Sequence, residues 1–283
     1  MPKSLREILK GKIPDEGLKK LRAFDIVGEI AVVKIPDELS PWKHEIGASL
    51  LKLHKNVRTV LNQNTPVAGE FRTRGLEVIA GDPRTETTYR ENGCTFKVDL
   101  AKAYFSPRLS WERLRIATLV KPGEAITNMF AGVGCYSIVI AKKSSPSVVY
   151  SIDKNPDAFQ YMCENIRINK VGDRVVPILG DATEVIENRL AGIADRVLMP
   201  LPEFSHDFVS HAIKALKYEG GTLHFYDFGE EPDVFGPSLR FLSSKASKMG
   251  FTLKLESARK IRSYATRCYH IALDVSLKKT EGR

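Results

Sequence analysis

From Ala125 onward, short apolar runs alternate with amphipathic stretches of helical periodicity. The apolar runs cover residues 125–130, 148–152, 175–179, 196–199 and 221–225. Repeated strand–helix units of this kind predict parallel strands, because parallel neighbours need a long crossover connection that a helix usually supplies. Two further apolar runs, at 251–256 and 269–275, predict strands that lie antiparallel at the sheet edge. This part of the chain is therefore predicted to be α/β, with a doubly wound, Rossmann-like sheet.

The chain before this region has a different pattern. Short β-branched or alternating runs lie at 25–36, 57–61, 77–80, 85–90 and 94–98. A stretch of helical spacing from about 41 to 53 separates the first two. This mixture predicts a small α+β domain. We therefore expect a first domain over residues 1–105 and a second, catalytic domain over residues 106–283.

Composition restricts the classes of partner. Lys and Arg total 43 against 34 Asp and Glu, a formal net charge of +9. This surplus favours a polyanionic partner, although a solvated basic surface would give the same count. The four cysteines and six histidines do not show the spacing of a zinc site, so no metal is expected. Apolar runs stay shorter than the roughly 18 residues that a membrane span needs, so we expect a cytoplasmic protein that has no membrane partner.

Three successive predicted strands end in residues suited to a nucleoside ligand. Gly132 and Gly134 follow the first strand, Asp153 ends the second and Asp181 ends the third. Glycines at a strand-to-helix turn let the backbone approach a ligand closely, and the helix start offers free N–H groups. An acid about 20 residues further on is placed to accept hydrogen bonds from ribose hydroxyls. The alternative interpretation is that Asp153 and Asp181 only cap the helices that follow.

This combination resembles the class I methyltransferases that use S-adenosyl-L-methionine, whose adenosine lies across these strand ends. The resemblance implies a cofactor site at Asn128, Phe130, Gly132, Gly134, Asp153, Lys154, Asp181, Ala182 and Met199. One residue departs from the family pattern: Asn128 stands where an aspartate is usual near the cofactor amino group. Asparagine keeps the shape and hydrogen bonding of that side chain but loses its charge.

The fourth predicted strand runs into Pro200-Leu201-Pro202. Proline fixes φ and lacks an N–H donor, so this loop should be stiff. Taken alone, a Pro-x-Pro segment indicates a structural turn. Methyltransferases that act on nitrogen carry an Asn/Asp-x-Pro segment at this place, and there it clamps the target base.

The wider sequence resembles a narrower family, the archaeal and eukaryotic tRNA (guanine-37, N1) methyltransferases. The resemblance extends from about Phe24 to Asp274. Its motifs are the segments 69–77, 91–93, 98–113, 129–134 and 262–274, in that order and spacing. It implies that tRNA is the partner, bound through its anticodon arm by a monomeric enzyme. Relatives often carry an extra N-terminal module, whereas this chain is expected to start at the second domain of such proteins.

The resemblance also implies catalytic roles. Methylation of guanine N1 requires removal of the N1 proton while negative charge develops toward O6. Glu112 matches the family's proposed general base, and Arg72 matches the arginine thought to stabilise the charge on O6. Tyr104 and Arg108 match residues that hold the base and the cofactor. From spacing alone, Arg108 and Glu112 could instead form an ordinary i,i+4 surface ion pair.

Basic and aromatic residues are predicted to meet the RNA. These candidates are Arg74, Arg113, Arg115, Arg262 and Tyr264. Pro200 and Pro202 are assigned to the acceptor loop, where the family usually has Asn-Leu-Pro. The small first domain is expected to recognise or support the tRNA.

Several alternatives remain open at this stage. Pro200 in place of asparagine favours C7 methylation of the tricyclic wyosine precursor at position 37, as in related enzymes. Other relatives transfer the aminocarboxypropyl group of the same cofactor. An RNA-binding protein with a vestigial cofactor pocket would explain Asn128. A small-molecule methyltransferase would explain neither the net charge nor the first domain.

Overall fold

The computed structural model describes residues 4–21 and 24–280. The chain divides into two compact units, Met1–Arg108 and Leu109–Arg283, and each unit is described by itself. Within the described ranges, no helix is long and apolar enough to cross a membrane.

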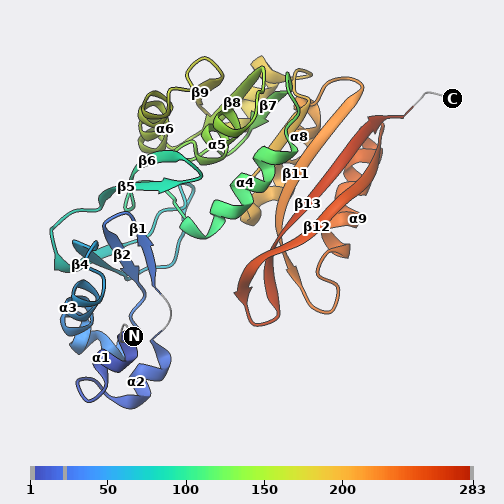
Figure 1. Ribbon diagram of the computed structural model, residues 1–283. Coiled ribbons are helices and arrows are strands. Elements are labelled where there is room, and N and C mark those ends of the chain that lie inside the picture. The colour runs from blue at the N-terminus through green and yellow to red at the C-terminus, as the bar shows by residue number, and fades with distance from the viewer. Residues whose placement is uncertain (1–3, 22–23, 281–283) are drawn as a thin grey trace. The chain divides into compact units, whose positions relative to one another are not determined.

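The first unit is built on a mixed four-stranded sheet with the order β1-β2-β3-β4 (Figure 1). Its strands are β1 (Asp25–Val27), β2 (Ile30–Val33), β3 (Thr59–Gln63) and β4 (Leu76–Gly81). The pairs β1–β2 and β3–β4 are antiparallel, and β2–β3 is parallel. The parallel pair requires a crossover, which α3 (Lys43–Leu53) supplies after a 3₁₀ turn, η1 (Asp37–Trp42).

Two short helices and a hairpin complete this unit. The helices are α1 (Leu5–Leu9), where Ser4 and Glu7 form a capping box, and α2 (Asp15–Lys20). The hairpin pairs β5 (Glu86–Glu91) with β6 (Cys94–Asp99). The core lies between the helices and the sheet and includes Leu9, Ile46, Leu50, Val60 and Ile79.

The second unit contains a seven-stranded sheet with the order β12-β13-β11-β10-β7-β8-β9. Its strands are β7 (Ala125–Asn128), β8 (Val148–Asp153), β9 (Val175–Leu179), β10 (Arg196–Met199), β11 (Gly220–Glu230), β12 (Phe251–Ala265) and β13 (Cys268–Lys279). The five strands from β7 to β11 pair in parallel, and β13 pairs antiparallel with both β11 and β12. The prediction of a doubly wound α/β sheet with an antiparallel edge is therefore confirmed.

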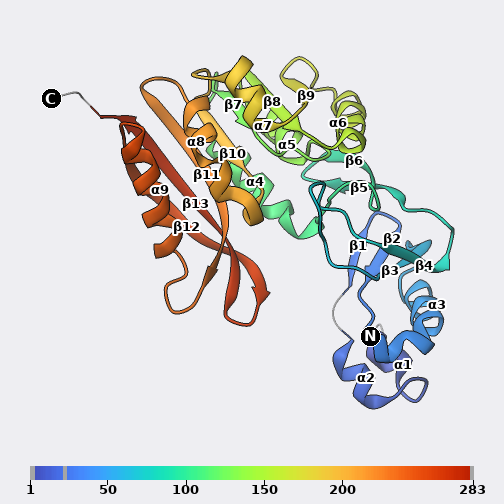
Figure 2. The same cartoon turned by 180° about the vertical axis from the view of Figure 1, so that it is seen from behind.

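Helices cover both faces of this sheet. One face carries α4 (Ser110–Leu119), α5 (Cys135–Lys143) and α6 (Pro156–Asn169). The other carries α8 (Ser205–Ala215) and α9 (Gly236–Lys248), as Figures 1 and 2 show. The short α7 (Ala182–Val185) and the π turn η3 (Ile186–Leu190) follow β9. A large apolar core fills the space between the sheet and the face of α8 and α9.

Three strands extend beyond their predicted ends. The apolar run that predicts β11 ends at Phe225, but the strand continues to Glu230. Tyr226–Glu230 pair with Cys268–Ala272 of β13, residues that lie about forty positions further along the chain. Strands β12 and β13 likewise continue past their apolar runs, and β13 stays paired with both β11 and β12. Pairing between distant segments, rather than local composition, therefore sets these ends.

Candidate cofactor and catalytic site

The glycine loop joins β7 to the start of α5. Gly134 is the N-cap of α5 with φ +90°, a left-handed conformation that side-chain-bearing residues rarely adopt. A Cβ at this position would lie 3.0 Å from Ile138 Cδ1 and 3.1 Å from Met162 Cγ. The backbone conformation therefore favours glycine here, as the strand-to-helix motif predicts, and a side chain would also make Ile138 and Met162 shift by a few tenths of an ångström.

Asp153 at the end of β8 fastens this loop. Its Oδ2 accepts a hydrogen bond from Gly132 N at 2.5 Å, and its Oδ1 accepts one from Asn155 N at 2.9 Å. Burial raises the pKa of the Asp153 carboxyl above its usual range, and the two backbone hydrogen bonds oppose that rise. An ionised carboxylate offers about four lone-pair positions, so this one keeps capacity for the two hydroxyls of a ribose.

Asp181 follows β9 and is the N-cap of α7. Its Oδ1 accepts hydrogen bonds from Thr183 N at 2.8 Å and Thr183 Oγ1 at 2.5 Å. Lys154 Nζ lies 3.3 Å from Oδ2. Burial acts to raise the pKa of Asp181, but the hydrogen bonds from Thr183 and Lys154 outweigh it and hold that pKa below its ordinary value. Asp181 thus does cap a helix, whereas α6 is capped by Asn155 and not by Asp153.

Asn128 lies at the end of β7 and is fully buried. Its Nδ2 donates to Ser137 Oγ at 3.1 Å, and Ser151 Oγ donates to the same oxygen at 2.7 Å. Its Oδ1 is a buried acceptor without a partner within the described part of the chain. A buried acceptor without a partner is rare and is consistent with an N–H donor that a ligand would bring. An aspartate here would bury a charge among neutral hydroxyls, so asparagine suits the site.

The loop after β10 carries the predicted acceptor segment. Met199 is buried, and its carbonyl accepts a hydrogen bond from Leu201 N at 2.8 Å. Pro202 opens a short 3₁₀ turn, η4 (Pro202–Phe204), and its carbonyl accepts a hydrogen bond from Ser205 Oγ at 3.2 Å. The segment around Pro200 is therefore a tight, hydrogen-bonded turn at the same end of the sheet as the glycine loop.

Glu112 lies in the first turn of α4 and is fully buried. Arg115 Nε and Nη2 donate to its two oxygens, each at 2.7 Å. The hydroxyl of Tyr226, on β11, donates to Oε1 at 2.6 Å. Burial raises the pKa of Tyr226 well above its usual value, so this hydroxyl stays a donor. A carboxylate held by a guanidinium and a phenol is fixed in both position and rotamer.

This arrangement corrects the ion pair that spacing allowed between Arg108 and Glu112. The Nε of Arg108 pairs with Asp25 Oδ1 at 2.6 Å, and Arg108 belongs to the first unit. A 3₁₀ turn, η2 (Pro107–Leu109), precedes α4, so the two residues do not share a continuous α-helical face.

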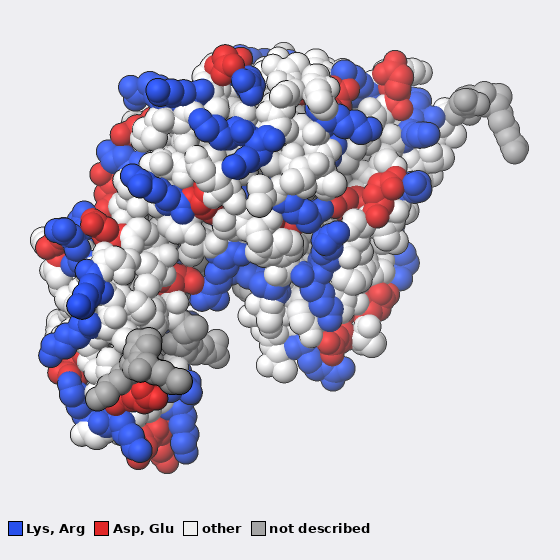
Figure 3. Space-filling model, in the orientation of Figure 1, with Lys and Arg blue, Asp and Glu red and all other residues white. Residues whose placement is uncertain are grey.

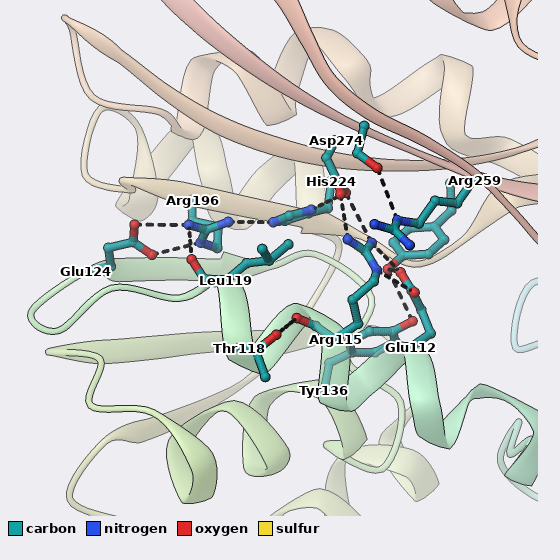
Figure 4. A network of polar contacts seen from close by, with 12 residues as sticks. Glu112, Arg115, Thr118, Leu119, Glu124, Tyr136, Arg196, His224, Arg259 and Asp274 are labelled. Carbon is teal, nitrogen blue, oxygen red and sulfur yellow. Dashed lines mark hydrogen bonds and ion pairs between the residues drawn. The ribbon is translucent and has the colours of Figure 1, made fainter.

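The polar contacts continue from Arg115 beneath α4. Arg115 Nη1 donates to Asp274 Oδ2 at 2.6 Å, and Asp274 Oδ1 lies 2.6 Å from His224 Nδ1. His224 Nε2 in turn lies 2.6 Å from Arg196 Nη1. Arg196 also forms an ion pair with Glu124, at 2.7 Å between Nε and Oε2. Figure 4 shows the side chains arranged in this sequence between α4 and the sheet.

Three further residues predicted for the site lie in the first unit, namely Arg72, Arg74 and Tyr104. Arg72 is half-buried with φ 55°, in the loop between β3 and β4. Arg74 donates from Nη1 to Gln63 Oε1 at 3.1 Å. Burial lowers the pKa of Arg74, while Tyr104 and Asp25 act in the opposite direction. Tyr104 is 40% exposed. Their predicted roles in catalysis and binding stay predictions.

Two predicted RNA contacts are corrected by the structure. Arg113 is buried, and the guanidinium of Arg115 is held between two carboxylates, so neither presents its charge to a phosphate at the surface. By contrast, Tyr264 is exposed and packs against Phe228 at 4.3 Å between ring centroids, and Arg262 is half-buried on the same strand. Figure 3 shows Lys and Arg side chains over β12 and the hairpin that joins it to β13.

Several polar groups of this site have no role that the sequence predicts. Tyr136, Arg196, His224, Tyr226 and Asp274 all join the polar network around Glu112. One signal was available, because polar residues at every second position of an apolar strand, as in His224 and Tyr226, indicate a polar face. Their partners could not be read from the sequence, since they lie up to 159 residues away. Among described residues, no group of three or more His, Cys, Asp or Glu could hold a metal ion.

Comparison with known proteins identifies the family. Residues 87–254 match the TRM5/TYW2 methyltransferase domain, and residues 5–85 match the TYW2 N-terminal domain. The chain belongs to the TRM5/TYW2 methyltransferase family. It is 44% identical over 274 residues to the tRNA (guanine(37)-N(1))-methyltransferase Trm5b of Pyrococcus abyssi, covering 96% of this chain and 80% of that protein.

Solved structures similar to this chain include complexes with tRNA and with the cofactor. The complex of aTrm5 with tRNALeu matches with a TM-score of 0.86 at 35% identity, over 98% of this chain and 78% of that one. The TYW2 of Methanocaldococcus jannaschii in complex with AdoMet matches with a TM-score of 0.71 at 29% identity, over 91% of this chain and all of that one. The family and its cofactor thus agree with the resemblance found in the sequence.

Proposed function

We propose that this TRM5/TYW2 family member transfers the methyl group of S-adenosyl-L-methionine to N1 of guanine-37 in tRNA. The observation that carries the proposal is the 44% identity to Trm5b over nearly the whole chain. The structural likeness to aTrm5 bound to tRNALeu supports tRNA as the substrate, and the net charge of +9 suits a polyanion. We further propose that the enzyme acts as a monomer on the anticodon arm, in the cytoplasm.

The residues at the carboxyl ends of β7, β8 and β9 fit the proposed cofactor. Asp153 would accept the ribose hydroxyls, and Asp181 would face the adenine amino group. The buried Oδ1 of Asn128 has no partner among described residues, which suits a donor such as the methionine ammonium. When bound, the cofactor supplies an electrophilic methyl group on a sulfonium. Phe130, Lys154, Ala182 and Met199 would complete the walls of this site.

Glu112 is the proposed general base. Methyl transfer to N1 would form an N–C bond as the methyl–sulfur bond of the sulfonium breaks, and the N1 proton must leave so that the product base is neutral. A fixed, fully buried carboxylate on α4 could accept that proton. Arg72 would stabilise the charge that develops on O6, as its place in the 69–77 motif suggests. The Pro200–Pro202 turn would limit the positions that the base can adopt.

The proposed activity is tested with unmodified tRNA transcripts that carry guanine or adenine at position 37. Purified enzyme and S-adenosyl-L-methionine are incubated with each transcript, and the nucleosides are identified by mass spectrometry. The expected product is N1-methylguanosine from the guanine-37 transcript alone. Methylation of both transcripts, or of neither, would contradict the proposal.

A second candidate reaction is favoured by two observations. Pro200 replaces the asparagine of the usual acceptor segment, and residues 5–85 match the N-terminal domain of TYW2. Both fit a substrate that already carries the tricyclic wyosine precursor, with C7 as the acceptor of a methyl or aminocarboxypropyl group. Transcripts carrying that precursor, assayed by the same mass spectrometry, distinguish this candidate, because the two groups differ in mass.

We also propose that the two parts of the chain have different functions. Residues 1–105 would form the supporting domain that meets tRNA, with Arg74 among its contacts. Residues 106–283 would carry catalysis, with Arg262 and Tyr264 as RNA contacts. The exposed ring of Tyr264 offers a face on which a base can stack, and Arg262 adds a nearby positive charge.

A further inference from the structure

A continuous row of buried polar groups runs beneath α4, within the second unit. At one end Arg196 Nη2 donates to Leu119 O, the last residue of α4, at 2.9 Å. At the other end Tyr226 Oη donates to Glu112 Oε1 at 2.6 Å, in the first turn of the same helix. Asp274 and His224 connect the middle of the helix to the sheet. The helix is therefore tied to the strands along its whole length.

The protonation states along this row follow from the partners. A guanidinium can only donate hydrogen bonds, so His224 Nε2 must accept from Arg196 and His224 Nδ1–H must donate to Asp274. Burial lowers the pKa of His224, which keeps the ring neutral. Burial acts to raise the pKa of Asp274, but the hydrogen bonds from His224 and Arg115 outweigh it and hold that pKa well below its usual range. Asp274 is therefore a buried carboxylate.

Arg115 is shared between two carboxylates. It donates from Nε and Nη2 to Glu112, and from Nη1 and Nη2 to Asp274. The side chains of Glu112 and Asp274 are 0% and 7% exposed, so solvent screens neither interaction strongly. The guanidinium of Arg115 thus bridges the two anions. Asp274 competes with Glu112 for Arg115 and weakens the hold of the guanidinium on Glu112.

Stability alone does not explain why these charges are buried. Taking ion pairs out of water costs several kcal/mol per ion, and well-packed apolar residues often stabilise such positions equally well. The next residues along the same strands, Leu223 and Leu273, face the opposite side and belong to an ordinary apolar core. The sheet can therefore bury apolar side chains here, yet the face under α4 carries charges.

We infer that Arg115, Asp274 and His224 are positioning residues for the reaction, which fix the carboxylate of Glu112 and set how strongly it accepts a proton. This inference rests on the proposed role of Glu112 as general base. Arg196 and Glu124 act one step further away by holding His224 in the tautomer that donates to Asp274.

Other charged and titratable groups face this row and stay constant in the test. Arg113 lies next to Glu112 on α4, and Tyr136 of α5 donates to Tyr226 at 3.3 Å between hydroxyl oxygens. His270 of β13 packs near Tyr226, with 5.7 Å between ring centroids. Arg259 of β12 points toward Asp274 (Figure 4).

The decisive variant is Asp274→Asn, which removes one charge with little change in shape. Single-turnover methyl transfer to the guanine-37 transcript is measured with saturating enzyme and cofactor across a range of pH. Arg115 would then pair with Glu112 alone and hold it more firmly in the ionised form. We expect the acidic limb of the rate profile to move to lower pH by about one unit, and the plateau rate to fall about tenfold. A purely structural role for Asp274 would lower the amount of active enzyme without moving the limb.

Three further variants make every outcome informative. Glu112→Gln tests the base itself: if it transfers methyl groups at the wild-type rate, the proposed role of Glu112 and this inference both fail. If Glu112→Gln is inactive while Asp274→Asn leaves the limb in place, only the inference is overturned.

Arg115→Lys keeps the positive charge but lacks the forked guanidinium that reaches both carboxylates. It replaces Asp274→Asn should that variant not fold. We expect it to lower the rate about tenfold at unchanged cofactor affinity, and a wild-type rate would overturn the inference. The matched control is Glu187→Gln, an exposed glutamate paired with Lys214, which should leave the profile unchanged.

Discussion

The two faces of the sheet in the second unit are covered in different ways. On β11 and β13, Leu223, Phe225, Leu273 and Val275 face α8 and α9, and all four are fully buried in the apolar core. The side chains between them face α4 and include His224, Tyr226 and Asp274, which are buried just as deeply but joined by hydrogen bonds and ion pairs. The same two strands thus carry an apolar face and a charged face.

The two faces therefore have different roles: apolar contacts stabilise the fold, whereas buried ion pairs position the reactive groups. Apolar burial contributes about 25 cal/mol for each Å² removed from water and tolerates small adjustments of the side chains. A buried ion pair contributes little net stability, but its geometry is specific and costly to disturb. The face under α8 and α9 therefore stabilises the sheet, and the face under α4 fixes the direction of Glu112.

The largest expected effect is on catalysis from the α4 face. Glu112→Gln keeps the shape of the side chain but cannot accept the N1 proton. We expect single-turnover methyl transfer to fall about 10²- to 10⁴-fold, the usual contribution of a general base. Binding of S-adenosyl-L-methionine, measured by calorimetry, should not change. A variant that keeps the wild-type rate would remove Glu112 from the mechanism.

The matching change on the apolar face should act on stability. Phe225→Ala leaves a cavity against α8 and α9, and we expect it to lower the free energy of unfolding by about 3–5 kcal/mol, measured by urea denaturation. The fraction that remains folded should keep the wild-type pH profile of methyl transfer. If the profile shifts instead, the two faces do not act separately, and the comparison breaks down.

A smaller effect is expected on how the free energy of unfolding depends on pH, through a histidine on the α4 face of the sheet. Burial, assisted by Arg262, lowers the pKa of His270 from 6.5 to about 4. The imidazole of His270 then binds a proton more tightly in the unfolded chain than in the folded one. The contribution of the buried, neutral His270 to stability is therefore complete above pH 6.5 and is lost as pH falls toward 4. The loss should reach roughly 3 kcal/mol for this single group. In His270→Phe, unfolding curves at pH 7 and pH 4 should differ less than in the wild type, and an unchanged difference would contradict this cause.

The smallest expected effect concerns the cofactor loop. Asp153→Asn keeps the size of the side chain but removes the charge that would accept the ribose hydroxyls. We expect the affinity for S-adenosyl-L-methionine to fall about tenfold, as calorimetry would show. Asp173→Asn is the matched control, because Asp173 is exposed and pairs only with neighbouring Arg174 among described residues. Equal affinities for both variants would exclude Asp153 from the cofactor site.

The cofactor residues could be predicted from the sequence because each lies at, or a few residues after, the end of a predicted strand. Gly132 and Gly134 lie in the loop after β7, and Asp153 is the last residue of β8. In a doubly wound sheet these strand ends meet at one edge whatever the helices between them contain. The class of fold followed from the same alternation of apolar runs and helical spacing.

The contacts between the charged residues under α4 could not be predicted from the sequence. Arg115 is three residues from Glu112, which suggests a pair on one helix, but its second partner is Asp274 on the last strand. That contact depends on the register of β13 against β11, which places Asp274 opposite His224. Register is set by pairing across the whole sheet, so the sequence does not predict that Arg113 and Arg115 lie beneath the surface.

Our central claim is that the charges buried under α4 serve the reaction rather than the fold. The most direct test uses Arg196 and Glu124, the ion pair furthest from Glu112 in the row. In the double variant Arg196→Met with Glu124→Met, both charges of one ion pair are replaced by apolar side chains. Removing both charges of the ion pair is itself neutral or stabilising, but His224 Nε2 and Leu119 O each lose a donor, so we expect the free energy of unfolding to fall by no more than about 1–3 kcal/mol. The decisive measurement is the single-turnover methyl transfer rate of this variant, which should fall about tenfold because His224 loses the partner that fixes its tautomer. A stable variant that transfers methyl groups at the wild-type rate would contradict the claim.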